Sequence, residues 1–463
     1  GSRTLRALTM LLASGVRCDF ETIVPIIIDP DISAADMTRT VDVLNRYMAV
    51  RKALDFNSAN KNQFFKTEIS HLQDMDSFKL TLENTENVSF KDFIKLNQMD
   101  TESKALMSML FSQANLDSDM VVGFKGNPNI GSIVLNQFAA SDAYKAFSNN
   151  FEEGDRVFII SSIFGGTGAS GFPLLLKTLR NDENSQHWKL IKESKIGAVT
   201  VLPYFNVEQD DNSGVDSSTF YSKTKSALAY YERNITGNNS INALYFIGDN
   251  MPASYKNHDG GSEQKNNAHM IELYAAISIL NFASTPDESL TGKTRTYEFG
   301  IDTCDEDIKQ VIFKDLGPET KGLIQKGLTM FFLMNKYIKN ELDDEYKHQP
   351  WAVDCGLDDN FFTSDFFNDL MRFEDAFATW LDELDNNKRS FKPFAQEKDN
   401  PLFDLVNGQK ARKLPVLSRN YSLLDSTMNG NWKGWNKSAS KEQKFIELFY
   451  RATDKLTLKK FNF

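Results

Sequence analysis

A strand that runs directly into a glycine-rich turn and then into a helix is the feature of this sequence that most restricts its fold. The segment RVFIISSIFGGTGASG (156–171) is followed by the apolar stretch FPLLLKTLR. The turn consists of Gly165, Gly166, Thr167, Gly168, Ala169, Ser170 and Gly171. Backbone N–H groups exposed by such a turn, together with the helix N-terminus, favour a phosphate, and Thr167 and Ser170 can add hydroxyl donors. The alternative is a tight turn that binds no ligand.

Further apolar strands alternate with helical segments over the first 290 residues. The expected strands are IVPIIIDPD (23–31), IGAVTVLPYF (196–205) and NALYFIGDN (242–250), and MVVGFKGNPNIG (120–131) is a strand-like entry into a glycine-containing loop. The expected helices are an amphipathic one over 1–12 and others over 35–54, 217–233 and 266–283, with a polar insertion over 56–100. Short apolar strands separated by helices are typical of a parallel sheet covered on both faces. We therefore predict an α/β fold.

Past about residue 290 the character of the sequence changes. A strand-like piece, TRTYEFGID (294–302), precedes mostly helical sequence, with helices expected over 319–341, 364–385 and 440–455. A chain of 463 residues is longer than a typical single domain. We predict an α/β domain over residues 1–290 and a mainly helical C-terminal domain over residues 291–463.

The composition excludes several classes of protein. Asp and Glu outnumber Lys and Arg by 63 to 52, a formal charge of −11, which argues against a general nucleic-acid binder. The three cysteines, Cys18, Cys304 and Cys355, do not make a disulfide framework, and five scattered histidines have no metal-ligand spacing. No apolar run approaches the roughly 18–20 residues that span a bilayer. We therefore expect a cytoplasmic protein without a membrane span.

The kind of nucleotide is narrowed by the residues around the glycine turn. The sequence has no G-x-x-x-x-G-K-[ST], so a P-loop enzyme is excluded. Gly166, Gly168 and Gly171 satisfy the dinucleotide pattern G-x-G-x-x-G, but the next strand ends at 202–204 without the acid that would bind the ribose. An NAD-binding oxidoreductase of the Rossmann type is therefore an alternative rather than the first hypothesis.

Five motifs in order resemble the tubulin/FtsZ superfamily of GTP-binding proteins, and two of them correspond to phosphate loops. FGGTGASG is similar to that family's signature loop G-G-G-T-G-[ST]-G, with Phe164 and Ala169 as departures. GFKGNPNIG (123–131) is similar to the FtsZ loop that closes on the terminal phosphates. The resemblance implies that Gly126, Asn127 and Pro128 contact the nucleotide.

The other three motifs correspond to contacts with the metal, the ribose and the base. IIIDPD (26–31) resembles the strand end near the metal, so Asp29 and Asp31 would face the metal or the attacking water, with Asp31 on Mg²⁺. PYFNVE (203–208) implies Glu208 as the ribose contact, and FIGDN (246–250) implies Asn250 as a guanine contact.

A second guanine contact is expected where the next helix, NNAHMIELYAAISILNF, begins. Asn267 is favoured, and His269 is a further candidate. Asn side chains both donate and accept hydrogen bonds, as recognition of the guanine edge requires. For Asn266 a helix cap is an equal alternative.

The opening segment GSRTLRALTMLLASG resembles the helix that comes after the family's first strand and first glycine loop. On that interpretation Gly1, Ser2 and Arg3 contact the phosphates, and the strand and most of the loop precede the sequence. The alternative is a Gly-Ser pair in front of an ordinary helix.

In this family an acid on the loop after the central helix completes hydrolysis in a neighbouring subunit. The corresponding stretch, NFASTPDESLTGK (281–293), contains Asp287 and Glu288 but not the usual N-x-D-[FL], so an ordinary polar loop is an alternative. The resemblance implies a bacterial-type GTPase that uses GTP/GDP and Mg²⁺, with the nucleotide state controlling self-assembly into filaments or partner binding. A non-hydrolysing, nucleotide-dependent interaction protein remains an alternative.

Overall fold

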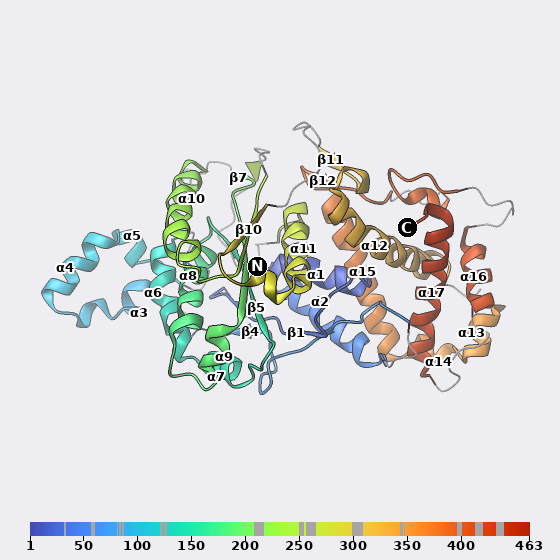
Figure 1. Cartoon of the computed structure of the whole chain (residues 1–463), viewed down its shortest axis with the longest axis horizontal. Coiled ribbons are helices and arrows are strands. Elements are labelled where there is room, and N and C mark those ends of the chain that lie inside the picture. Colours follow the sequence, from blue (N-terminus) through green and yellow to red (C-terminus); the bar gives the residue numbers. More distant parts are fainter. Residues whose placement is uncertain are drawn as a thin grey trace.

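The computed structural model describes most of the chain. The described residues are 1–31, 34–56, 61–80, 82, 85, 88–120, 124, 127–207, 217–249, 254–255, 265–298, 309–342, 346, 348–395, 401–412, 420–431 and 439–463. The molecule is elongated, with a parallel sheet in one half, C-terminal helices in the other, and a helical arm projecting beyond the sheet (Figure 1).

Four parallel strands form the central sheet. They are β5 (Arg156–Ser162), β6 (Lys195–Val201), β8 (Ala243–Ile247) and β10 (Arg295–Glu298), in the order β10-β8-β6-β5. The prediction of an α/β fold built on a parallel sheet is therefore confirmed. The described part of the strand predicted over 294–302, β10, forms the edge of this sheet beside β8 and does not belong to the helical region after it.

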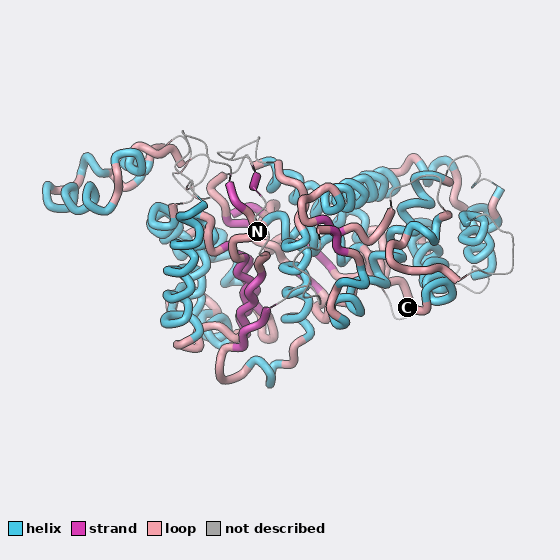
Figure 2. The backbone as a smooth tube through the Cα atoms, turned by 90° about the horizontal axis from the view of Figure 1, so that it is seen from above, coloured by secondary structure: helices cyan, strands magenta, loops and turns pink. Residues whose placement is uncertain are grey.

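Helices cover both faces of the sheet, because the strands carry apolar side chains on both sides. Ile196 and Leu244 face a core that includes residues of α6 (Pro128–Leu135) and α8 (Gly166–Asn181). Val199 and Tyr245 face a second core built with α1 (Ser2–Ala13) and α11 (Met270–Ser284). In Figure 2 the strands of the sheet run between these two helical layers. Alternation of side chains along each strand explains the two cores.

The first helix differs from the prediction. An amphipathic helix was expected over 1–12, but α1 is buried on all sides from Thr4 to Ala13. It packs against α2 (Ala35–Lys52), α11 and α12 (Pro318–Asn340). Even Arg6 is only 4% exposed, because its guanidinium pairs with Glu383 at 2.7 Å. A helix with neighbours on every side is a core element rather than a surface one.

The predicted strand over 23–31 is broken into two short pieces. These are β1 (Thr22–Ile23) and β2 (Ile27–Ile28), separated by Pro25, which has no N–H for a sheet. Each pairs in parallel with a strand of the polar insertion, β1 with β3 (Glu68–Ile69) and β2 with β4 (Lys79–Leu80). The insertion is therefore part of the fold.

A helical arm comes after β4. It carries α3 (Phe90–Phe93), α4 (Thr101–Leu110) and α5 (Gln113–Leu116), and it projects away from the body in both views (Figures 1 and 2). No residue of α4 is buried. Smaller described elements lie between the main strands and helices after the arm, and they are α7 (Asp142–Asn149), α9 (Trp188–Glu193), β7 (Asn206–Val207), α10 (Ser217–Tyr231) and β9 (Ser254–Tyr255), of which β7 pairs in parallel with β9.

The predicted C-terminal helices are present as α12, α15 (Asp365–Asp385) and α17 (Lys441–Phe461). Smaller elements lie between them, and they are β11 (Gln310–Val311), α13 (Pro350–Cys355), α14 (Asp359–Phe362), β12 (Ser390–Phe391) and α16 (Asn420–Asn431). The core that includes α1 and α11 continues without a break into these helices. This larger core has residues both before and after position 290, so it does not separate two domains there. The division of the chain into two domains at residue 290 stays a prediction. No helix in the described ranges is long and apolar enough to cross a membrane.

A buried carboxyl group lies in this shared core. Glu374 on α15 is fully buried, and its Oε2 accepts a hydrogen bond from Asn335 Nδ2 at 2.7 Å. Within the described residues its Oε1 has no hydrogen-bond partner. Burial raises the pKa of Glu374 from 4.5 to about 8, although Asn335 and Lys339 oppose the shift. The side chain is therefore neutral in the folded protein at pH 7.

The raised pKa of Glu374 predicts that stability falls as the pH rises. Below about pH 4.5 the carboxyl is neutral in both the folded and the unfolded chain, and stability is lost progressively as the pH rises from there through about 8. Glu374→Gln keeps an oxygen acceptor for Asn335 and removes the ionisation. We expect the variant to equal the parent near pH 4.5 and to exceed it by on the order of 3 kcal/mol at pH 9, measured as urea unfolding midpoints.

Glu193→Gln is the matched control, since it makes the same change at an exposed glutamate on α9 that is not among the charges acting on Glu374. That variant should leave the slope of stability against pH unchanged. Parallel profiles for the parent and Glu374→Gln would contradict the assignment.

Candidate functional site

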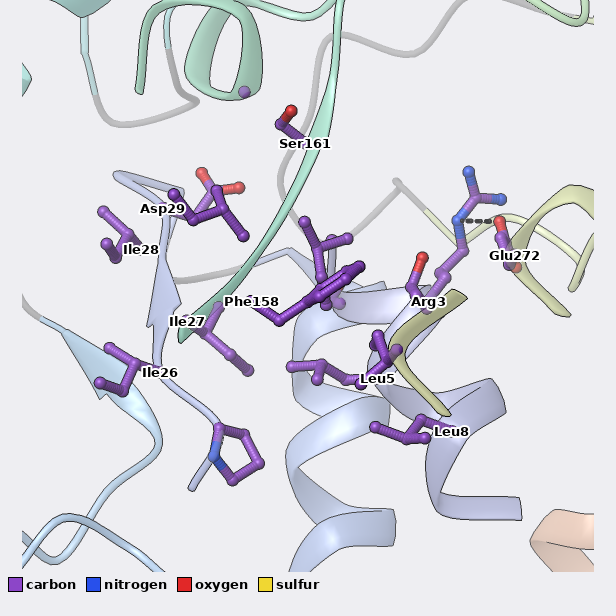
Figure 3. A pocket seen from close by; sticks show the side chains of 18 of the residues that line it. Arg3, Leu5, Leu8, Ile26, Ile27, Ile28, Asp29, Phe158, Ser161 and Glu272 are labelled. Atoms are coloured by element: carbon purple, nitrogen blue, oxygen red, sulfur yellow. Dashed lines mark ion pairs between the residues drawn. The ribbon is translucent and has the colours of Figure 1, made fainter. Parts of the chain in front are cut away.

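A cavity of about 1350 Å³ follows β5 along its whole length and opens beside the glycine turn. Its polar mouth is lined by Gly1, Ser2, Asp29, Asp31, Gly165, Gly166, Thr167, Gly168, Lys265, Asn266 and Asn267. Its apolar channel is lined by Leu5, Leu8, Ile26, Ile27, Ile28, Phe158, Ile160, Leu175, Leu179 and Phe282. Figure 3 shows Asp29 and Arg3 near the mouth, with Ile26, Phe158 and Leu8 lower in the cavity.

The glycine turn forms one wall of the mouth. Helix α8 begins at Gly166, and its N-cap Gly165 has no side-chain cap, so no N-cap side chain occupies the first N–H groups. A Cβ on Gly168 would lie 2.8 Å from Ser162 N, and this close approach requires glycine. The turn therefore presents backbone donors and a positive helix end to the cavity.

The second half of the turn does not face the cavity. Ala169, Ser170 and Gly171 are in the first turns of α8 and are absent from the cavity lining. The Ser170 hydroxyl donates to Gly166 O at 2.7 Å, so its capacity as a donor is used inside the helix. This geometry does not favour the predicted phosphate contact of Ser170, whereas Thr167 lines the mouth.

A second helix begins at the same mouth. Gly1 is the N-cap of α1 and lies beside β5, where a Cβ on Gly1 would be 3.9 Å from Ile160 O. Burial lowers the pKa of the Gly1 amine, and the nearby Arg3 lowers it further. The N-termini of α1 and α8 thus converge on one space, which favours an anion there.

Two acids close the mouth on the side of β2. Asp29 Oδ1 accepts a hydrogen bond from the Asp31 N–H at 3.0 Å, and Asp31 is buried. Burial raises the pKa of Asp29 to about 6, although the Asp31 N–H bond opposes this shift. No group of three or more metal-type side chains occurs in the described part of the chain. One or two carboxylates suit Mg²⁺ when substrate phosphates complete its coordination, so this donor set fits that ion together with a nucleotide.

Of the described residues of the predicted loop over 123–131, Phe124 lines the cavity, whereas residues 127–131 lie next to the start of α8 and outside the lining. Asn127 caps α6, its side chain accepting from the N–H groups of Asn129 at 3.0 Å and Ile130 at 3.4 Å, and Pro128 is the first residue of that helix. Helix α6 packs closely on α8. Three predicted contacts, Gly126, Glu208 and Asn250, lie outside the described residues.

The two asparagines before α11 have different environments. Asn266 is fixed to Asp36, to which its N–H and its Nδ2 both donate, at 3.2 and 3.1 Å. Asn267 is exposed and lines the mouth. Neither caps the helix, because His269 is the N-cap of α11. The predicted base contact at Asn267 therefore has an accessible side chain, and the alternative of a cap at Asn266 is wrong.

His269 is held in a neutral, structural position. Its Nδ1 accepts from the Ile271 N–H at 3.1 Å, and Glu272 completes the capping box. Burial lowers the pKa of His269 to about 3, and the positive charges of Arg3 and Arg389 add to the effect.

The predicted phosphate contact Arg3 lines the cavity, but its guanidinium is bound by other protein groups, and the aromatic side chains near it were not predicted from the sequence. The Arg3 guanidinium pairs with Glu272 Oε1 at 2.8 Å and donates to Tyr204 OH and to Asn267 O, each at 3.2 Å. Figure 3 shows the ion pair of Arg3 with Glu272. The aromatic residues contact one another beyond the end of β6, and they are Phe164, Tyr204, Phe205 and Tyr255. In the sequence, only the adjacent aromatic residues Tyr204 and Phe205 of PYFNVE indicated that an aromatic group could form here.

The C-terminal region also reaches the mouth. Asn386, Asn387 and Lys388, just after α15, line the cavity. Asn387 Nδ2 donates to Ala268 O at 2.9 Å, and Tyr255 OH donates to Asn387 Oδ1 at 2.7 Å. Residues beyond the predicted boundary at 290 therefore contribute to the site.

The predicted catalytic acids lie at the other end of β5. Asp287 and Glu288 are in a short 3₁₀ helix, Asp287–Leu290, and Asp287 pairs with Arg156 at 2.7 Å. Arg156 is the first residue of β5, whereas the glycine turn comes after its last residue. A strand of seven residues spans about 20 Å, so these carboxylates do not reach the mouth of their own molecule.

Comparison with known proteins gives no assignment, since no protein-family model matches the chain and no curated protein matches it. The family resemblance therefore stays a prediction based on the five motifs.

The close approach at Gly168 predicts a position-specific effect on stability. In Gly168→Ala the new Cβ would meet the backbone of Ser162 at 2.8 Å from N and 3.0 Å from O, and backbone cannot yield as a side-chain tip does. We expect a loss of roughly 1–3 kcal/mol, seen as a lower thermal unfolding midpoint.

Gly322→Ala serves as the control, because Gly322 is a position inside α12 with open space around it. That variant should gain about 0.5–1 kcal/mol from helix propensity. If both variants shift the midpoint in the same direction, the tight turn is not what restricts Gly168.

Proposed function

We propose that this protein is a tubulin/FtsZ-like guanine-nucleotide-binding protein, a GTPase whose nucleotide state controls assembly with copies of itself or with a partner. The proposal rests on one observation, which is that several features suited to a nucleotide lie around the same cavity mouth. Two helix N-termini, two adjacent acids and an accessible asparagine line one cavity mouth at the carboxyl edge of a parallel sheet. Ligands of open α/β sheets bind at this edge.

The phosphate end of the nucleotide is assigned to the glycine turn. Gly165–Gly168 offer backbone N–H groups, Thr167 offers a hydroxyl, and the start of α1 adds a second positive helix end. Asp29 and Asp31 would hold Mg²⁺ against the phosphates. When bound, that ion supplies charge neutralisation for the transferred phosphoryl group.

The base is assigned to the side of the mouth near Asn267. Its amide can donate to and accept from a purine edge, and its backbone oxygen is fixed by Arg3. The aromatic residues Phe205 and Tyr255 also line the cavity and offer faces for stacking. Preference for guanine over adenine follows from the resemblance and from an amide side chain that can adapt to a guanine edge.

Hydrolysis is proposed to be completed between two molecules. In the reaction a water oxygen bonds to the γ-phosphorus, the bond from that phosphorus to the bridging oxygen breaks, and GDP, inorganic phosphate and a proton are released. The position of Asp287 and Glu288, at the end of β5 opposite the mouth, supports a role for them on a neighbour's nucleotide rather than on their own. A carboxylate there can orient the water and accept its proton.

A non-hydrolysing interaction protein is the second candidate, and one contact favours it. Asp287 is paired with Arg156 of its own molecule. To act on the nucleotide of a neighbouring molecule, the Asp287 carboxylate must either separate from Arg156 or orient water while it stays paired. If it does neither, no hydrolysis takes place and the nucleotide serves only as a structural ligand.

Nucleotide binding by the purified chain tests the proposal directly. Labelled GTP should bind and should be displaced by GTP but not by ATP or NAD. Asn267→Ala should weaken GTP binding by about tenfold and reduce the preference over ATP, since it removes one base hydrogen bond. Fluorescence competition titrations give both quantities.

Asn368→Ala is the matched control, because Asn368 is an exposed asparagine on α15 outside the cavity lining. It should leave both affinities unchanged. Displacement by NAD alone would assign the turn to a Rossmann-type oxidoreductase, and no binding of any of the three would reject the nucleotide proposal.

Completion of the site by a neighbour predicts complementation between two inactive variants. Asp287→Asn combined with Glu288→Gln should keep GTP binding and lose at least about 100-fold in turnover. Gly168→Ala should lose nucleotide binding but keep both acids. A mixture of the two variants should recover turnover, because one supplies the nucleotide site and the other the acids. Phosphate release at rising protein concentration measures this.

The control is a second pair of adjacent acids, Asp182→Asn with Glu183→Gln, just after α8. It should turn over GTP as the parent does. Undiminished turnover in the Asp287 and Glu288 variant would exclude these acids from hydrolysis, and GTP binding without any turnover in the parent would favour the second candidate.

A further inference from the structure

A lysine from the C-terminal region lies at the side of the mouth to which the base is assigned. Lys388 comes just after α15, lines the cavity and is exposed. Its Nζ donates to Ser254 O and lies 5.0 Å from the centroid of the Tyr255 ring. Because Tyr255 is one of the two aromatic faces offered to the base, this ammonium group lies beside the position of the base.

The backbone around Lys388 is held to the carboxyl edge of the sheet. The next residue, Arg389, pairs with Asp249 at 2.5 Å, and Arg389 Nη2 also donates to Asp249 Oδ1 at 2.9 Å. Both side chains are almost fully buried. Asp249 lies two residues after the end of β8, so the segment after α15 is anchored where the parallel strands end. A planar guanidinium with two contacts to one carboxylate fixes direction as well as distance.

The residue before Lys388 connects it to the predicted base contact. Asn387 Nδ2 donates to Ala268 O at 2.9 Å, and Ala268 directly follows Asn267 in the chain. Lys388 and Asn267 therefore approach the mouth from two segments that are hydrogen-bonded to each other. Both residues are exposed and both line the cavity. This arrangement favours contact of one purine base with both side chains.

The ammonium group of Lys388 has donors to spare, unlike the other cation on this side of the mouth. The Arg3 guanidinium is paired with Glu272 at 2.8 Å, so its charge is neutralised within the protein. In the described part of the chain Lys388 has no carboxylate partner, and its hydrogen bond to Ser254 O uses one of its three N–H donors. Two donors therefore remain for a ligand.

Guanine and adenine differ at the atoms that a lysine can recognise. Guanine presents O6 and N7 as acceptors, whereas adenine presents an N6 amino donor beside N7. An ammonium group has only donors, so it stabilises guanine and cannot pair with the adenine amino group. The Asn267 amide both donates and accepts, so it does not exclude adenine. A donor-only group beside the base supplies the discrimination that the amide lacks.

We propose that Lys388 is the residue that selects guanine over adenine, by donating from Nζ to O6 of the bound nucleotide. The C-terminal region then takes part in choosing the nucleotide, and does not only pack against the half of the molecule that holds the sheet. The inference rests on the proposed guanine-nucleotide site and names the residue that gives this site its preference.

Four nucleoside triphosphates separate recognition of O6 from attraction to the phosphate charge. GTP and inosine triphosphate carry O6, whereas ATP and 2-aminopurine riboside triphosphate do not. Lys388→Met keeps an apolar stem and removes the ammonium group. In this variant of the full chain the affinities for GTP and inosine triphosphate should fall by about 10- to 100-fold, because a charged hydrogen bond is lost. The affinities for the other two should change little. Titration calorimetry measures all four.

Lys265→Met is the matched control, because Lys265 is another exposed lysine of the mouth lining. Any loss that it causes should be equal for all four nucleotides. Equal weakening of all four in Lys388→Met, unchanged affinities for GTP and inosine triphosphate, or a parent without preference for GTP over ATP would overturn the inference and leave the nucleotide site in place. A parent that binds none of the four would reject the proposed function, and this inference with it.

Discussion

The arrangement around the mouth depends on one buried carboxylate, Glu383 of α15. Its oxygens accept from Arg6 on α1 at 2.7 Å, from Arg39 on α2, and from the Ala268 N–H at 2.9 Å, just before α11. The residue is only 9% exposed. Removing it would leave the buried Arg6 guanidinium without its carboxylate, whereas Arg39 would keep Asp36, and an uncompensated buried charge costs on the order of 3–5 kcal/mol. The starts of two site-forming helices are thus positioned from the C-terminal region.

This contact explains why the helical region is inseparable from the site. Glu383 lies three residues before Asn386, where the chain begins to line the cavity, and Asn387 binds both Ala268 and Tyr255. A ligand that moved the segment around Asn267 would therefore act on the end of α15 through short, buried contacts. The contacts from Asn267 through Ala268 and Asn387 to the end of α15 are therefore contiguous, as coupling between two distant sites requires.

The sequence predicted the sheet and its glycine turn, because strand burial and turn chemistry are local properties. The runs around Ile159, Val199 and Tyr245 carry their own signal, and so does the turn at Gly168. The burial of α1 on all sides was not predictable, since the neutralisation of Arg6 depends on Glu383, 377 positions away. The break at Pro25 was visible in the sequence, but the pairing of β2 with a strand of the polar insertion was not. The cavity itself arises from long-range topology, which periodicity does not encode.

The mouth and the channel are parts of one cavity, which lies between two separate sheets. Asp29 comes directly after β2, and the glycine turn lies beyond the end of β5, yet β2 and β5 belong to separate sheets. Nothing in the backbone ladder of the described strands therefore sets the distance from the acids to the turn. Helix packing sets it instead, because α2, which begins shortly after Asp31, packs on α1, and Gly1, the N-cap of α1, lies beside β5. Fixed geometry at a phosphate site lowers the cost of binding, because less motion is lost. The packing of α1 against α2 therefore positions the acids and the glycine turn relative to each other, although neither of these two helices belongs to a sheet.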